Sequence, residues 1–276
     1  MKSDAPRSPE IIAHRGFSGR FPENTIPALL GAFDAGCSSL EFDLRWTADG
    51  IPILFHDETL DRTTDGSGAV AELVFSDIAR LDAGSWYSPG FAGVRVPSLE
   101  EAVAHIRSRA RHIYAEVKAV PEPAALDALL EILRRTGIHP HTTVISLDHD
   151  LLEELRARDS ELELGWVVAS EERFEPALRT VAADGRALLD PDAQLLLDVP
   201  ERTREVVSRE VPLVTWTVDD PRRAEQLRRL GVRRITTNEV LRLLAWARDA
   251  GRVDADSKPE CGDIGAQPRP PSGGTG

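Results

Sequence analysis

The sequence predicts an α/β fold, a TIM (β/α)8 barrel with a small insertion after the second strand region. Short β-like runs alternate with amphipathic helical patterns along the chain, which is typical of a parallel sheet. Length alone would fit one large domain or two small ones. The roughly eight strand–helix repeats match a closed barrel better than an open doubly wound sheet.

The elements follow from this alternation. Runs rich in apolar and β-branched residues predict strands at 11–14, 39–46, 51–56, 112–118, 143–147, 163–168, 187–189, 212–218 and 234–237. The run at 187–189 is the weakest of them. Amphipathic patterns predict helices at 25–35, 99–109, 123–135, 151–158, 174–183, 202–209, 221–230 and 240–248.

Two stretches interrupt the rhythm. Residues 57–97 hold TTDGSG, a short helical SDIARL and DAGSWYSPGFAG, so we expect an insertion there. Beyond Gly251 the composition shifts to GDIGAQPRPPSGGTG, which has too little apolar surface to offset the cost of ordering. The sequence therefore predicts a barrel over 1–250 and a disordered tail over 251–276.

Composition limits the classes of partner. The net charge of -13 and the pI near 5.0 give no general basic surface for nucleic acid, so we expect a small-molecule ligand. Two cysteines, Cys37 and Cys261, do not indicate a disulfide framework. The N-terminal MKSDAPRSPE lacks an apolar signal core, and no stretch suits membrane insertion, so a cytoplasmic location is expected. The oligomeric state is not indicated.

The strand at 39–46 carries charge on one face. Glu41, Asp43 and Arg45 share that face, because side chains alternate along a strand, while Leu40, Phe42, Leu44 and Trp46 share the other. The two acids lie about 7 Å apart and repel by roughly 2 kcal/mol at an effective dielectric of about 20. A divalent cation would reverse the sign of that interaction. The alternative is a strand end in which Arg45 pairs with the acids.

A third acid extends this hypothesis. Glu116 in YAEVK shares a face with Lys118, which could contact a phosphate oxygen; a plain ion pair is the alternative for these two residues. An all-carboxylate set favours Mg²⁺ or Ca²⁺ over Zn²⁺. In a TIM barrel these residues would converge with the histidines at the C-terminal ends of the strands.

Two histidines end predicted strands beside these acids. His14 and His56 suit proton transfer near neutral pH, although a histidine in such a place is more often structural. Arg15 can contact phosphate in a bidentate manner or form a salt bridge at the rim. Trp216 is either core or a cover over a substrate. No role is assigned to His105, His112, His139, His141 and His149.

Several blocks in order and spacing resemble the glycerophosphodiester phosphodiesterase family over residues 11 to about 245: AHRG (13–16), PENT (22–25), EFDLRWTADGIPILFHD (41–57), LDAGSW, PSLEEAV, AEVK and TWTVD. The resemblance implies a TIM barrel with an insertion after the second strand. It also implies metal-dependent hydrolysis of glycerophosphodiesters to glycerol 3-phosphate and an alcohol. The implied roles are acid/base catalysis for His14 and His56, metal binding for Glu41, Asp43 and Glu116, and phosphate contact for Arg15 and Lys118.

One departure from the family pattern follows the last predicted strand. Relatives often read ITDxP where this chain reads ITTNEV (235–240), so Asn238 replaces an acid and cannot carry its charge. Two other functions stay open. A lysophospholipase D would need an exposed apolar insertion, for which Trp86, Tyr87 and Phe91 are candidates. A non-catalytic phosphodiester-binding barrel would not need both histidines.

Overall fold

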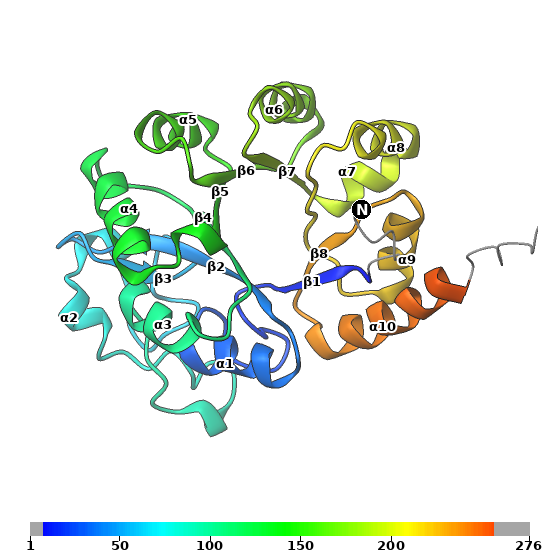
Figure 1. Ribbon diagram of the computed structural model, residues 1–276. Coiled ribbons are helices and arrows are strands. Elements are labelled where there is room, and N and C mark those ends of the chain that lie inside the picture. The colour runs from blue at the N-terminus through cyan, green and yellow to red at the C-terminus, as the bar shows by residue number, and fades with distance from the viewer. Residues whose placement is uncertain (1–7, 257–276) are drawn as a thin grey trace, which may run out of the picture.

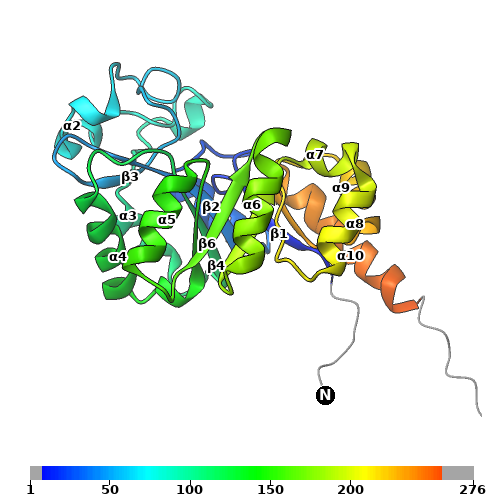
Figure 2. The same ribbon diagram turned by 90° about the horizontal axis from the view of Figure 1, so that it is seen from above.

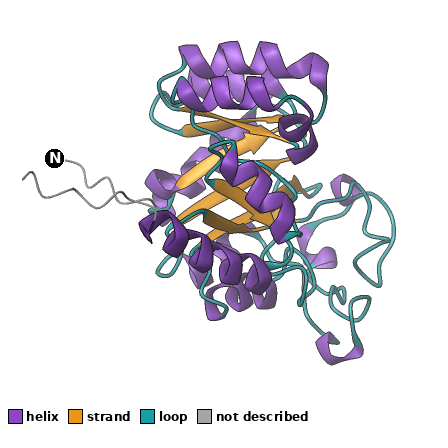
Figure 3. Cartoon of the chain, turned by 90° about the vertical axis from the view of Figure 1, so that its right-hand side faces the viewer, coloured by secondary structure: helices purple, strands orange, loops and turns teal. Residues whose placement is uncertain are grey.

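The structure, a computed structural model, describes residues 8–256. Its strands lie in the centre and its helices on the outside (Figure 3). The hydrogen-bonded strand order is β7-β6-β5-β4-β2-β1-β8, and every neighbouring pair along it is parallel. These strands are β1 (Glu10–Ala13), β2 (Ser39–Trp46), β4 (His112–Val117), β5 (Thr142–Ser146), β6 (Glu163–Val168), β7 (Ala187–Pro191) and β8 (Arg234–Thr237).

The segment 212–218 closes the ring between β7 and β8. Val214 N–H donates to the Leu189 carbonyl at 3.0 Å, and Thr236 N–H donates to the Thr215 carbonyl at 2.8 Å. The segment makes isolated parallel bridges on both sides, to Leu189 of β7 and Asp192 just after it, and to Ile235 of β8, rather than a continuous ladder. The predicted TIM barrel is confirmed, and the weakest predicted strand is present as β7.

The third strand lies outside the ring. β3 (Pro52–Leu54) runs antiparallel to the end of β2, and the chain then enters long loops with η1 (Val70–Glu72), α2 (Phe75–Ile78) and η2 (Pro89–Phe91). This part has a small core separate from the barrel core, made of Ile53, Phe55, Leu60, Val70, Ile78, Ala83 and Val96. Figure 2 shows these loops with α2 extending beyond the ends of α3 and α4 at one end of the barrel.

The outer helices are arranged around the strands in Figure 1: α1 (Ile26–Asp34), α3 (Leu99–Ile106), α4 (Ala124–Thr136), α5 (His149–Arg158), α6 (Glu171–Ala183), α7 (Ala193–Asp198), α8 (Pro200–Ser208), α9 (Pro221–Arg229) and α10 (Val240–Asp256). A short η3 (His139–His141) precedes β5. Helix α7 was not predicted. Helix α10 continues over 251–256, where the tail was expected to begin, and 257–276 lie outside the described residues. None of the described helices combines the length and apolar character needed to cross a membrane.

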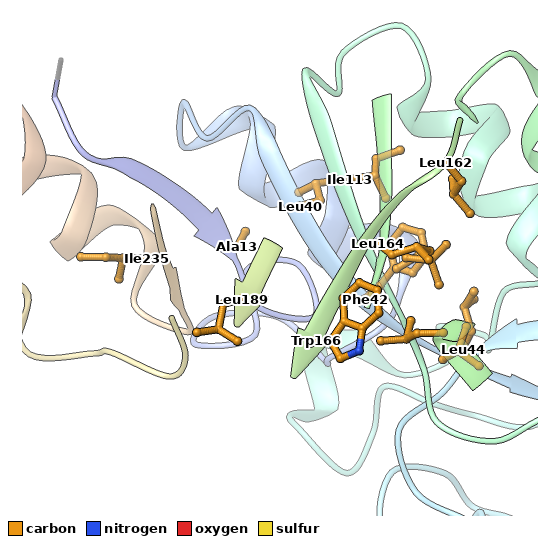
Figure 4. Packing of buried hydrophobic residues seen from close by; sticks show 14 of the residues in the cluster. Ala13, Leu40, Phe42, Leu44, Ile113, Leu162, Leu164, Trp166, Leu189 and Ile235 are labelled. Carbon is orange, nitrogen blue, oxygen red and sulfur yellow. The ribbon is translucent and has the colours of Figure 1, made fainter. Parts of the chain in front are cut away.

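The two faces of the strands have different neighbours. Outward-facing Leu40, Phe42 and Leu44 of β2 belong to the main core between strands and helices, with the residues seen in Figure 4. A second buried cluster occupies the barrel interior and consists of Ile12, Tyr114, Ile145, Val167, Leu188 and Val214. Because side chains alternate, Glu41 and Asp43 face that interior, as the sequence pattern predicts.

Candidate active site

The turn after β1 brings His14 and Arg15 to the mouth of the barrel. Gly16 has φ +75°, and a Cβ there would lie 2.6 Å from the carbonyl carbon of Ala28, so only glycine lets this turn approach helix α1. Arg15 also has a positive φ of 56°. Its backbone N–H then points inward and donates to Glu41 Oε2 at 2.7 Å.

The PENT block (22–25) holds Arg15 and Asp43 in place. Glu23 accepts from the Arg15 guanidinium at 2.8 Å. Asn24 donates through Nδ2 to Asp43 Oδ2 at 2.8 Å, and its Oδ1 accepts from the Asp43 backbone N–H at 3.1 Å. Thr25 caps helix α1 by accepting from a backbone N–H of the first turn. This motif therefore fixes the orientation of Asp43 and the start of the helix together.

Three buried carboxylates meet at the centre of the site. Glu41, Asp43 and Glu116 offer oxygens that all lie within 4.8 Å of one another. Glu41 is 2% exposed and its Oε1 has no hydrogen-bond partner within the structure as described. Burial and the charges of the other two acids raise the pKa of Glu41 well above its usual value. Such a cluster of hard oxygen donors could hold a cation.

Two cations lie beside these acids. Lys118 Nζ is 2.9 Å from Asp43 Oδ1 and 2.6 Å from Glu116 Oε1, while Arg15 Nε is 3.1 Å from Asp43 Oδ2. Burial alone would raise the pKa of Asp43, but Lys118 and Arg15 outweigh it and hold that pKa below its ordinary range. Burial and the charge of Asp43 raise the pKa of Glu116 as well, so the two glutamates differ from Asp43 in the direction of their pKa shifts.

His14 has a neutral partner. Its Nδ1 lies 2.7 Å from Asn238 Oδ1, and Asn238 Nδ2 donates to Asp219 Oδ2 at 2.9 Å. Since Asp219 fixes the amide orientation, Asn238 can only accept from His14, so Nδ1 carries the proton and Nε2 is free. That Nε2 is 3.9 Å from Glu41 Oε2. Burial, reinforced by Arg15, lowers the pKa of His14 to about 4.

His56 has a charged partner instead. Its Nδ1 lies 2.6 Å from Asp57 Oδ1, and Arg62 Nε donates to Asp57 Oδ2 at 2.6 Å. Arg62 also donates to Glu23, at 2.7 Å. Arg45, which the sequence left unassigned, donates to the His56 carbonyl at 2.7 Å and so holds the turn that carries this histidine, rather than pairing with the acids of its own strand. Burial lowers the pKa of His56 as well.

These groups open into one cavity of about 190 Å³. Of the residues selected from the sequence, His14, Arg15, Glu41, His56, Glu116, Lys118 and Trp216 line it. Asp43 is fully buried beside them. The structure therefore brings all the predicted site residues to one place.

Comparison with known proteins identifies the family. The family model described as "Glycerophosphoryl diester phosphodiesterase family" matches residues 14–242, which include this whole site. The chain belongs to the glycerophosphoryl diester phosphodiesterase family. A glycerophosphodiester phosphodiesterase of Caldanaerobacter subterraneus is 31% identical over 87% of this chain and 98% of its own length.

Solved structures agree with the family fold. An Oleispira antarctica phosphodiesterase, in complex with the product sn-glycerol-3-phosphate, superposes with a TM-score of 0.79 at 26% identity, covering 87% of this chain and 97% of that one. A glycerophosphodiester phosphodiesterase from Agrobacterium tumefaciens gives a TM-score of 0.69 at 26% identity, covering 85% and 99%.

Within this family member, sequence reasoning missed residues that support the site: Glu23, Asn24, Asp57, Arg62 and Asp219. Two signals were present, since PENT was noted as a block and Asp57 directly follows His56. Arg62 and Asp219 lie in loops whose approach depends on the whole fold. Asn238 itself carries no charge, but it bonds to Asp219, so a carboxylate lies at the far end of the His14–Asn238–Asp219 chain of hydrogen bonds.

Proposed function

We propose that this chain hydrolyses glycerophosphodiesters to glycerol 3-phosphate and an alcohol. The observation that carries the proposal is the single cavity in which two imidazoles face buried acids and two cations. Family membership supports it, and so does the product named in the Oleispira complex. In this arrangement Arg15 and Lys118 contact the phosphate, and Trp216 covers the substrate.

We propose Mg²⁺ or Ca²⁺ as the cofactor, held by Glu41, Asp43 and Glu116. The orphaned Glu41 Oε1 and the mutual repulsion of the three acids fit a missing positive charge, and oxygen donors suit hard cations. A bound divalent cation would polarise the phosphoryl group and offset its developing negative charge. Lys118 and Arg15 lie beside these acids, so their positive charges can hold the phosphate next to the proposed cation site.

We assign different proton-transfer roles to the two histidines. His14 has a protonated Nδ1 held by a neutral amide, so its Nε2 lone pair is available to deprotonate the nucleophile, whether water or a neighbouring substrate hydroxyl. Burial lowers the pKa of His56, but the Asp57 carboxylate against its Nδ1 opposes that effect and favours the imidazolium, so His56 suits donation to the leaving alkoxide better than His14 does. The assignment rests on these partners.

The proposal is tested by assaying the purified protein on glycerophosphocholine with Mg²⁺, Ca²⁺ or EDTA. His14→Ala and His56→Ala should each lower kcat by about 10²–10⁴-fold. His105→Ala is the control, because that side chain on α3 is exposed and its ring nitrogen bonds to the Glu101 carbonyl of the same helix, away from the cavity. Full activity in EDTA, or histidine variants as active as the control, would contradict the proposal.

A comparison of deacylated and acylated substrates tests the lysophospholipase D alternative. The cavity of about 190 Å³ is below the usual range for drug-sized ligands, which favours a compact substrate. Trp86, Tyr87 and Phe91 pack in a row against Phe21 of the β1–α1 turn, so these aromatics join the insertion to the barrel. We expect faster turnover of the deacylated substrate; the reverse order would favour the lysophospholipid.

A further inference from the structure

The cavity has two unlike halves. The charged half comes from β1, β2, β4 and the turn after β3, and holds His14, Arg15, Glu41, His56, Glu116 and Lys118. The opposite half comes from the later strands and is largely apolar, with Ile145, Val167 and Trp216 among its walls. Asp190 is the one carboxyl group lining that second half, and the chemistry described above does not use it.

Asp190 is buried, and one of its carboxyl oxygens has no hydrogen-bond partner among the described residues. It lies near the C-terminal end of β7, two residues after the interior-facing Leu188, and is 2% exposed. Its Oδ1 has no hydrogen-bond partner among residues 8–256. Buried polar groups in native proteins are nearly always satisfied, and an orphan costs about 1–3 kcal/mol. A partner that arrives with the substrate explains why such a group is tolerated here.

The surroundings of Asp190 select the chemistry of that partner. Trp216 donates from its indole to the Asp190 carbonyl at 2.9 Å, which fixes an apolar wall beside the carboxyl. Burial, together with the charge of Glu116, raises the pKa of Asp190 well above its usual value. The unpartnered Oδ1 beside this apolar wall can accept a hydrogen bond from a hydroxyl group, and a carboxyl that carries its proton can also donate one.

We propose that Asp190 binds a hydroxyl group of the glycerol moiety, while the charged half of the cavity binds the phosphate. This inference rests on the proposed function and adds the residue that recognises glycerol. Glycerol phosphate is the part that all the substrates share, whereas the leaving alcohol varies. A deeply buried group suits the constant part, and the variable alcohol can extend toward solvent.

Calorimetric binding of two ligands tests the proposal without requiring turnover. Glycerol 3-phosphate and n-propyl phosphate share the phosphate but differ in the two hydroxyls. We expect the wild-type protein, with Mg²⁺ present, to bind glycerol 3-phosphate at least about tenfold more tightly. Asp190→Ala should reduce that preference to about twofold or less, and Asp190→Asn, which still donates and accepts, should retain part of it.

Thermal unfolding separates recognition from a structural role. Because Oδ1 has no hydrogen-bond partner among the described residues, Asp190→Asn should leave the Tm equal to or above that of the wild type. An unchanged hydroxyl preference in Asp190→Ala, an absent preference in the wild type, or an equal loss of affinity for both phosphates would overturn the proposal.

Substrate turnover tests whether Asp190 binds a cationic headgroup instead of a glycerol hydroxyl. If Asp190→Asn lowered kcat/KM for glycerophosphocholine but not for glycerophosphoglycerol, the carboxyl would bind the ammonium headgroup and the hydroxyl proposal would be wrong. A parallel loss on both substrates supports it. Wild-type protein that hydrolysed no glycerophosphodiester would refute the proposed function, whereas the hydroxyl preference would still be measured by binding.

Discussion

The contact between Asn238 and Asp219 gives a quantitative test of how His14 is held. Among the described residues, the Asp219 carboxylate accepts three hydrogen bonds, from the Asn238 backbone and side chain and from Thr237 Oγ1. Asn238→Asp would place a second carboxylate 2.9 Å from Asp219 Oδ2, in the position of the present Nδ2. The substitution restores the acid that relatives often carry, but here it meets an acid that is already present.

Two estimates bound the loss of unfolding free energy in Asn238→Asp. Two charges at that distance repel by about 6 kcal/mol at an effective dielectric of about 20. Protonating one carboxyl of ordinary pKa at pH 7 costs about 4 kcal/mol, so the pair takes up a proton instead. Asp219 and Asn238 are only partly buried, so solvent lowers the loss of unfolding free energy to about 2–4 kcal/mol at pH 7.

The pH dependence has a defined sign. The substituted carboxyl pair has one pKa raised in the folded state, so the penalty is absent below about pH 4 and grows by about 1.4 kcal/mol per pH unit. It stops growing once the pH passes the raised pKa. Urea unfolding of wild-type and Asn238→Asp protein at pH 5, 6, 7 and 8 measures this difference directly.

The exchanged pair is the matched control. Asp219→Asn combined with Asn238→Asp keeps an amide against a carboxylate and still offers His14 Nδ1 an acceptor. It should recover most of the stability lost in the single variant. A stability difference that does not change between pH 5 and 8, or a double variant less stable than Asn238→Asp, would refute the reasoning.

Three further predictions concern separate parts of the chain. Millimolar Ca²⁺ or Mg²⁺ should raise the Tm of the wild type, EDTA should reverse the rise, and Glu41→Gln should abolish it because one donor is lost. Gly16→Ala should cost about 2–4 kcal/mol in urea unfolding, whereas Gly36→Ala, with positive φ but nothing within 4 Å of its Cβ, should cost about 1 kcal/mol. Burial opposes the low pKa of Asp159, but hydrogen bonds, foremost from His139, hold it at about 2. Asp159→Asn should therefore cost about 1 kcal/mol at pH 7, after allowance for screening, and this difference should shrink as the pH falls from about 4 toward 2.

The fold could be predicted because its signals are local. Period-two alternation in 39–46 and the regular return of amphipathic helices depend on nearest neighbours, and parallel strands joined by helices leave few topologies. The sequence could not show that β3 lies outside the ring, since an antiparallel return after a short turn has the same apolar pattern as a barrel strand. Segment 212–218 likewise has the composition of a strand, and only the structure shows that it pairs through isolated bridges.

The inner site was predictable for a related reason. The site residues chosen from the sequence lie in predicted strands or just after them, and in a TIM barrel the C-terminal ends of the strands converge. The supporting contacts come from loops, whose paths depend on the packing of the whole molecule. Asp219 lies 19 positions from Asn238, and Arg62 lies 39 positions from Glu23. In the sequence alone, Asp219 and Arg62 look like the charged residues of any solvent-exposed loop.

Glu23 connects Arg15, proposed to bind the phosphate, with the residues that hold His56. On one side it accepts from Arg15, which lies at Asp43. On the other it accepts from Arg62, which holds the partner of His56. Two arginines compete for this carboxylate, and together they lower its pKa although burial opposes them. Because Arg62 belongs to the insertion and Arg15 to the turn after β1, the shared Glu23 carboxylate links the insertion to the residues proposed for phosphate binding and acid/base catalysis.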